Sequence, residues 1–108
     1  MSVLLAVLLA LTPAELKEDL HILRQTFEDA HAGLYRYTPK AELDAAFDAV
    51  EAQLDRPMQE LEFYRLLAPL IDRIHDGHTG LSPSRDTLRR LARAKVFPLD
   101  VRYIDGRA

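Results

Sequence analysis

Apolar side chains recur at intervals of three and four residues along most of this chain, the spacing of one face of an α-helix. The first stripe consists of Leu16, Leu20, Leu23 and Phe27. Thr12-Pro13-Ala14-Glu15 precedes it in the order of a helix start, with Thr at the N-cap, Pro at the first position and Glu at the third. The sequence therefore predicts a helix from Pro13 to about Asp29 or Ala30, with Gly33 just beyond.

Two further stripes have the same spacing. One comprises Leu43, Phe47, Val50 and Leu54, and the other comprises Leu61, Tyr64, Leu67, Ile71 and Ile74. Thr38-Pro39 repeats the start signal, so the second helix is predicted from Pro39 to about Leu54. The third is predicted to kink at Pro69, which has no backbone donor, and to stop at Gly77.

A shorter helix is predicted from Thr87 to Ala94. It carries Leu88 and Leu91 on one side and a solvated basic face on the other, made of Arg89, Arg90 and Arg93. The predicted fold class is therefore mainly α, with a bundle of three to four helices forming one helical N-terminal domain over residues 12–94.

The period changes to two after this bundle, because apolar and other residues alternate over Val96–Ile104. One β-strand is predicted there, followed by Asp105-Gly106, a dipeptide typical of a two-residue hairpin turn. Residues 95–108 are thus expected to begin an incomplete hairpin. Since a hairpin needs a second strand, we expect the natural chain to continue past Ala108.

The chain begins with an apolar run, Val3–Leu11, that is too short to span a bilayer. Its length suits the apolar core of a secretory signal, so residues 1–11 are interpreted as a signal-peptide remnant of a protein exported to the periplasm or the extracellular space. The alternative is that this run extends the first helix at its N-terminal end. In that case the protein is expected in the cytoplasm.

Composition excludes several classes of function. Over 108 residues the formal net charge is −3 and no Trp is present, so nucleic acid is not an expected partner. The absence of cysteine excludes disulfides, thiolate metal sites and a cysteine nucleophile. No Gly-rich phosphate loop occurs, and no cofactor is expected.

One dense polar segment, residues 75–80, reads His-Asp-Gly-His-Thr-Gly. Gly77 and Gly80 allow positive backbone angles, so they are expected to shape a sharp loop that presents His78, a side chain suited to moving protons. Asp76 or Thr79 is expected to orient its ring. The alternative is an ordinary helix end with no chemistry. A metal site at this segment lacks further ligands at a defined spacing, so no metal is expected.

A second segment, residues 31–37, contains two aromatic side chains, Tyr35 and Tyr37. They are interpreted either as caps on the end of the bundle or as the wall of a substrate-binding groove.

These segments together resemble the start of a serine peptidase of the tail-specific, C-terminal-processing type, in the branch of the tricorn core and the retinoid-binding-protein-like members. The specific parts are His-x-x-Leu-Tyr at 31–35 and Asp-Gly-His-Thr at 76–79, and the resemblance covers about residues 13–106. It implies that residues 95–108 lead into a PDZ-like and catalytic α/β region.

The resemblance implies roles for single residues as well. In the tricorn-like branch a histidine of the helical segment serves as general base to the serine, and His78 matches it in type. The tricorn pattern has a serine directly before that histidine, where this chain has Gly77. The lysine-based dyad of the tail-specific branch makes His78 structural instead.

Two hypotheses of function follow. In the first, this is the N-terminal part of a serine endopeptidase that binds peptide or protein substrates through its downstream region. None of Ser2, Ser82 and Ser84 matches the family's nucleophile motif, so the chain alone is expected to be inactive. In the second, it is a stand-alone helical protein-binding or inhibitory module.

Overall fold

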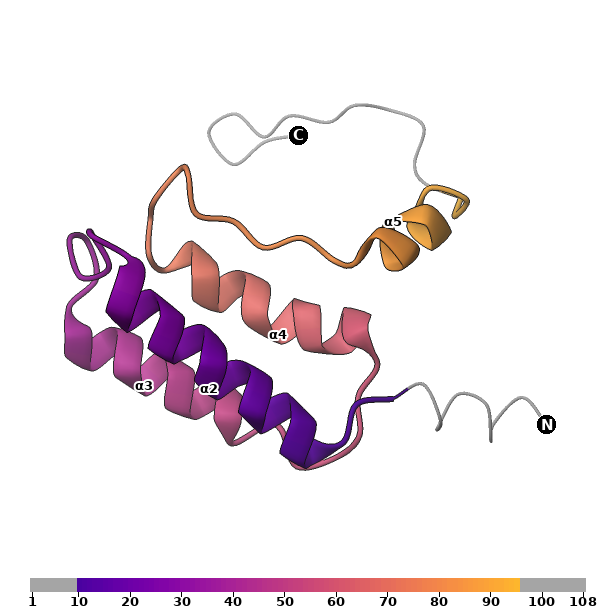
Figure 1. Cartoon of the computed structure of the whole chain (residues 1–108), viewed down its shortest axis with the longest axis horizontal. Helices are drawn as coiled ribbons and strands as arrows, with labels where there is room; N and C mark the ends of the chain where they lie inside the picture. The colour runs from indigo at the N-terminus through magenta and orange to yellow at the C-terminus, as the bar shows by residue number, and fades with distance from the viewer. Residues whose placement is uncertain (1–9, 96–108) are drawn as a thin grey trace, which may run out of the picture.

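The computed structural model describes residues 10–95, and within them the chain is mainly helical, as predicted (Figure 1). The four helices are α2 (Pro13–Ala30), α3 (Lys40–Glu51), α4 (Glu60–Asp72) and α5 (Arg85–Leu91). The predicted strand at 96–104, its hairpin turn and residues 1–9 of the predicted signal remnant lie outside the described residues. None of the described helices is long and apolar enough to cross a membrane.

The start of α2 is the predicted capping box. The Thr12 hydroxyl accepts from the Glu15 backbone N–H at 3.3 Å, and the Glu15 carboxylate accepts from the Thr12 backbone N–H at 2.8 Å. Both bonds satisfy donors that a helix start leaves free, which fixes where α2 begins. Just before it, Leu11 exchanges two backbone hydrogen bonds with Met58, so the chain entering α2 is tied to the segment that leads into α4.

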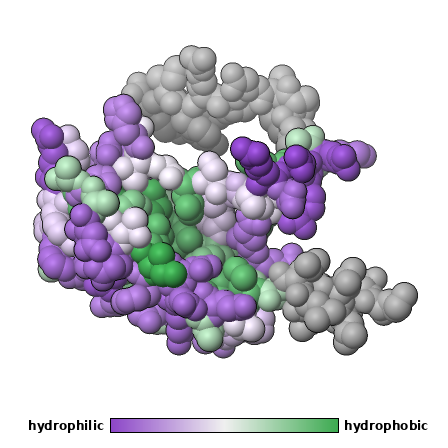
Figure 2. Space-filling view, in the orientation of Figure 1, coloured by the Kyte–Doolittle hydropathy of each residue, from purple (hydrophilic) through white to green (hydrophobic). Residues whose placement is uncertain are grey.

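The apolar stripes of the first three helices meet in one core. α3 packs against both α2 and α4 (Figure 1), and the apolar side chains appear green between more polar rims in Figure 2. The buried cluster comprises Leu16, Leu20, Leu34, Leu43, Phe47, Val50, Leu54, Met58, Phe63, Leu67, Leu70 and Ile74.

Arg24 joins α2 to α3 above this core. Its guanidinium donates to Asp44 at 2.7 Å and to Asp48 at 2.9 Å, and it lies over the Phe47 ring at 5.3 Å from the centroid. One long side chain therefore covers Phe47 and pairs with two carboxylates of the neighbouring helix.

Two predicted helix ends are wrong by several residues. α3 ends at Glu51, three residues before Leu54, because the Gln53 and Leu54 backbone N–H groups bond three residues back and tighten the last turn. α4 ends at Asp72, well before Gly77, for the same reason: the N–H groups of residues 73–75 bond three residues back. Leu54 is nevertheless fully buried, and α4 continues past Pro69.

The predicted start signal of α3 is also different in the structure. Thr38 does not cap α3, which has Pro39 at its N-cap and no side-chain cap. The buried Thr38 hydroxyl instead donates to the backbone carbonyl of Arg73, at the end of α4. A tertiary hydrogen bond has thus replaced the local one.

The last helix lies apart from the others, beyond an extended link (Figure 1). It spans Arg85–Leu91 and not Thr87–Ala94 as predicted, because the Ser84 side chain caps it by accepting from the Thr87 N–H. Leu88 and Leu91 stay 45% and 40% exposed, and Thr87 is the buried residue of the helix.

Glu60, at the start of α4, holds the start of α5. Its carboxylate accepts from the Ser84 backbone N–H, and from the hydroxyls of Ser84 and Thr87 at 2.8 Å each. The Ser84 backbone N–H, together with these hydroxyls, lowers the pKa of Glu60 below its ordinary value of 4.5. The ionised carboxylate is thus the form that holds α5 in place.

We expect the attachment of α5 to weaken in acid. A lowered pKa contributes stability that is fully present above pH 4.5 and is lost as the pH falls through the lowered value. Glu60→Gln should reproduce that loss at neutral pH, seen as faster hydrogen exchange of the Ser84 and Thr87 amides. Glu62→Gln removes a carboxylate that pairs with Arg56 and is the matched control. Equal exchange in both variants would contradict this role of Glu60.

Candidate functional site

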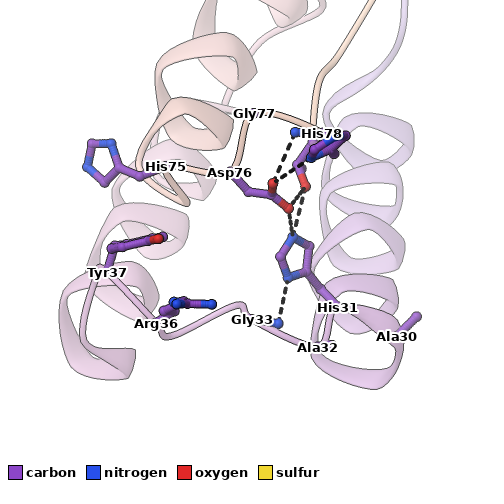
Figure 3. Close-up of a pocket in the computed structure, with 11 residues that line it drawn as sticks. Ala30, His31, Ala32, Gly33, Arg36, Tyr37, His75, Asp76, Gly77 and His78 are labelled. Carbon is purple, nitrogen blue, oxygen red and sulfur yellow. Dashed lines mark hydrogen bonds and ion pairs between the residues drawn. The ribbon is translucent and has the colours of Figure 1, made fainter.

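The two segments that the sequence analysis singled out meet at one end of the bundle. Residues 31–38 follow α2 and residues 73–80 follow α4, and two side-chain bonds join them: Thr38 to the Arg73 carbonyl, and His31 to Thr79. Figure 3 shows the His31 ring directed across to the Asp76 loop, which we define as residues 75–80. The helix ends thus bring together residues that lie 35 and 48 positions apart in the sequence.

A chain of hydrogen bonds begins at His31, the C-cap of α2. The Gly33 backbone N–H donates to His31 Nδ1 at 3.2 Å, so Nδ1 is an acceptor and the ring proton lies on Nε2. Nε2 lies 2.8 Å from the Thr79 hydroxyl and 3.2 Å from Asp76 Oδ2, and the Thr79 hydroxyl donates to that same Oδ2 at 2.9 Å. His31 and Thr79 therefore both face one oxygen of the carboxylate.

The other oxygen of Asp76 faces His78. Oδ1 accepts from the His78 backbone N–H at 3.0 Å and lies 3.7 Å from His78 Nδ1. The donation from the His78 N–H, followed by that from the Thr79 hydroxyl and the proximity of His31 and His78, lowers the pKa of the Asp76 carboxyl group. Asp76 is therefore a fixed anion at neutral pH.

His78 itself is fully exposed, with its side chain at 101% of the reference accessibility. Its only side-chain neighbour of opposite charge among the described residues is Asp76, at Nδ1, which leaves Nε2 without a protein partner there. Of the two residues predicted to orient this ring, Asp76 is adjacent to it, whereas Thr79 bonds to His31 and Asp76. An imidazole with a carboxylate at Nδ1 and a free Nε2 can accept a proton from a group brought to it.

The predicted reason for the shape of this loop is wrong. Gly77 and Gly80 were expected to supply positive backbone angles, but neither has one, and a Cβ at either position meets nothing within 4 Å. The left-handed residue is His75, with φ of 56°, directly after the turn that ends α4. A non-glycine residue in this region is uncommon, though histidine is among the types that adopt it more often.

A hollow of about 450 Å³ opens between the two segments (Figure 3). Its lining includes His31, Arg36, Tyr37, His78 and Thr79. Tyr37 is 62% exposed, and the Arg36 guanidinium carbon lies 5.5 Å from the centroid of the Tyr37 ring.

Tyr35 lies elsewhere. It is 39% exposed, has the Lys40 ammonium 5.5 Å from its ring centroid, and does not line the hollow. Of the two tyrosines that the sequence suggested for a groove, only Tyr37 borders the hollow beside His78.

His31 was given no role from the sequence, although it opens the His-x-x-Leu-Tyr segment at 31–35. Its local signal was weak: a histidine at the end of the first predicted helix, two residues before Gly33. The tertiary fold places this ring against Asp76, although nothing in its spacing predicts a partner there. Within residues 10–95 no group of three or more His, Cys, Asp or Glu side chains is arranged to hold a metal ion.

Comparison of the chain with family models, curated proteins and solved structures gives no match. The function is therefore argued from the residues of the site.

Proposed function

We propose that this chain is the N-terminal helical part of a serine-type endopeptidase of the tail-specific, tricorn-like kind. In this proposal His78 is the general base for a serine supplied from outside these 108 residues. The observation that carries the proposal is the exposed His78 ring, with the Asp76 carboxylate 3.7 Å from Nδ1 and with Nε2 free of partners among the described residues. A histidine between a carboxylate and a nucleophile is the arrangement that activates serine for acyl transfer.

Each side chain has one task in this proposal. His78 Nε2 takes the proton of the serine hydroxyl as that oxygen attacks the peptide carbonyl, and later returns a proton to the leaving amine. Asp76 remains ionised and stabilises the imidazolium that forms in between, since its lowered pKa keeps it anionic. Thr79 helps hold Asp76 through the bond to Oδ2.

The nucleophile has to come from elsewhere for a geometric reason. The Ser84 hydroxyl donates to Glu60, and no serine hydroxyl bonds to His78 in the part of the chain that the structure describes. The hollow beside His78 supports the placement of a peptide there, with the exposed face of Tyr37 against it. Tyr35 lies outside the hollow and has no role in this proposal.

A second candidate is a stand-alone helical module that binds or inhibits another protein. One observation favours it: α5 leaves Leu88 and Leu91 45% and 40% exposed, so its apolar side is only partly covered. This candidate needs no role for His78, so the two proposals differ in what substitution of His78 does.

The purified 108-residue chain should cleave no peptide or protein, because it holds the base and lacks the nucleophile. The native polypeptide, captured from its source with an antibody to residues 12–94, should react with a fluorophosphonate probe that labels activated serines. A native polypeptide that remains unlabelled would overturn the peptidase proposal and favour the binding module. Turnover by the 108-residue chain that survives repurification and requires His78 would overturn the proposed external nucleophile.

A further inference from the structure

We infer that His31 is a positioning residue for this site: through its Nε2–H it holds the Thr79 hydroxyl, which in turn holds the Asp76 carboxylate so that Oδ1 faces the His78 ring. The inference rests on the proposed role of His78 as general base, and it assigns a function to a residue that the sequence analysis left without one.

The two oxygens of the Asp76 carboxylate have different partners. Oδ2 accepts from the Thr79 hydroxyl at 2.9 Å, and the oxygen of that hydroxyl lies 2.8 Å from His31 Nε2, which is itself 3.2 Å from Oδ2. Oδ1 faces only His78, through the backbone N–H at 3.0 Å and the ring Nδ1 at 3.7 Å. Rotation of the carboxylate would break the bond at Oδ2, so this bond and the His31 ring behind it fix the direction of Oδ1.

The bonds within the Asp76 loop are local, whereas the bond from His31 joins this loop to the end of α2. The bonds from His78 and Thr79 to Asp76 lie within four consecutive residues, so they shape the loop without placing it on the bundle. His31 is the residue of this hydrogen-bond chain that lies outside the loop, at the C-cap of α2. Its own backbone N–H bonds to Phe27, and its ring packs edge-on against the Phe27 ring at 5.9 Å. The site is thereby anchored to the end of α2.

The hydrogen bonds at His31 determine which of its ring nitrogens is the donor. Because the Gly33 N–H donates to Nδ1, the donor is Nε2–H. The His31 side chain is only 14% exposed, whereas that of His78 is fully exposed. One histidine is therefore fixed as a donor and the other is free to act as a base, although both face the same carboxylate.

Three variants test this on the chain itself. His31→Phe keeps a ring against Phe27 and removes the donor, while His31→Gln keeps an N–H group that can reach Asp76. His21→Phe makes the same change at an exposed histidine of α2 and is the matched control. The readouts are the tautomer of His78, from its ring nitrogen chemical shifts, and the solvent exchange of the His78 amide. Neither depends on catalysis.

In His31→Phe we expect the His78 amide to exchange about tenfold faster, since its bond to Oδ1 is no longer held. We also expect His78 to lose the Nδ1–H tautomer that Asp76 favours. His31→Gln should restore both readouts most of the way, and His21→Phe should change neither. If His31→Phe does not fold, Thr79→Val removes the neighbouring bond to the same oxygen and should give the same two changes.

A folded His31→Phe chain with unchanged amide exchange and tautomer would overturn the inference, as would equal changes in His21→Phe. Failure of the proposed function looks different. If His31→Phe frees His78 as expected but His78→Ala leaves the peptidase fully active, His31 positions the loop and the loop is not catalytic.

Discussion

Replacing His78 by alanine should lower the turnover of the proposed peptidase by about 10²–10⁴-fold, the usual contribution of a general base. The physical reason is that the serine hydroxyl then has no acceptor for its proton during attack on the substrate carbonyl. The loss should appear in kcat more than in KM, because proton transfer takes place in the transition state and not in substrate binding. The measurement is steady-state hydrolysis of a peptide substrate by both enzymes.

The same variant should hardly change stability. The His78 side chain is fully exposed and covers no part of the core, and substitutions at such positions usually change the free energy of unfolding by less than about 0.5 kcal/mol. His21→Ala, at an exposed histidine of α2, is the control and should leave turnover unchanged. If His78→Ala lowers the melting temperature while turnover of the folded enzyme stays within about threefold, the residue only supports the helix end, and its catalytic role is excluded.

Phe47→Ala should reduce the free energy of unfolding by about 3–5 kcal/mol. Phe47 is only 3% exposed and belongs to the core shared by α2, α3 and α4, so truncation removes apolar burial and leaves a cavity. It also removes the ring over which the Arg24 guanidinium lies. Such a loss is a large part of the 5–15 kcal/mol that stabilises a typical domain, and urea denaturation followed by circular dichroism measures it.

Two further substitutions control this experiment. Ile22→Ala, at a side chain 55% exposed on α2, should cost less than about 0.5 kcal/mol. Phe47→Leu keeps much of the apolar volume and should cost less than Phe47→Ala, so it gives a measurable value if the alanine variant does not fold. A loss below about 1 kcal/mol for Phe47→Ala would contradict the packing of α3 described above.

The sequence predicted the helices because their determinants are local. The Thr12 capping box and the spacing of Leu16 and Leu20 act within a few residues, and α2 has the predicted bounds. The face of α3 was correct for the same reason, and that of α4 was correct in part, because Leu67, Ile71 and Ile74 are buried whereas Leu61 and Tyr64 are not. The predicted ends of both helices were wrong. An end depends on whether the last turn tightens, and apolar spacing carries no information about that.

The site could be predicted only in part. The segment at 75–80 was singled out because a histidine, an aspartate and glycines are adjacent in the sequence, and the loop does present His78. The role of Gly77 and Gly80 was wrong, because the turn after α4 places the positive angle on His75. His31 was missed, because its partners Asp76 and Thr79 are 45 and 48 residues away along the chain.

By itself the sequence determined which segments are helical, where α2 begins, and which polar segments deserved scrutiny, since backbone capping and apolar periodicity are short-range effects. The tertiary structure decided what those segments do to one another. Packing of α3 against α2 and α4 set two helix ends side by side, so that Thr38 bonds to the Arg73 carbonyl and His31 bonds to Thr79. Such bonds depend on distances between elements, which the order of residues along one helix does not encode.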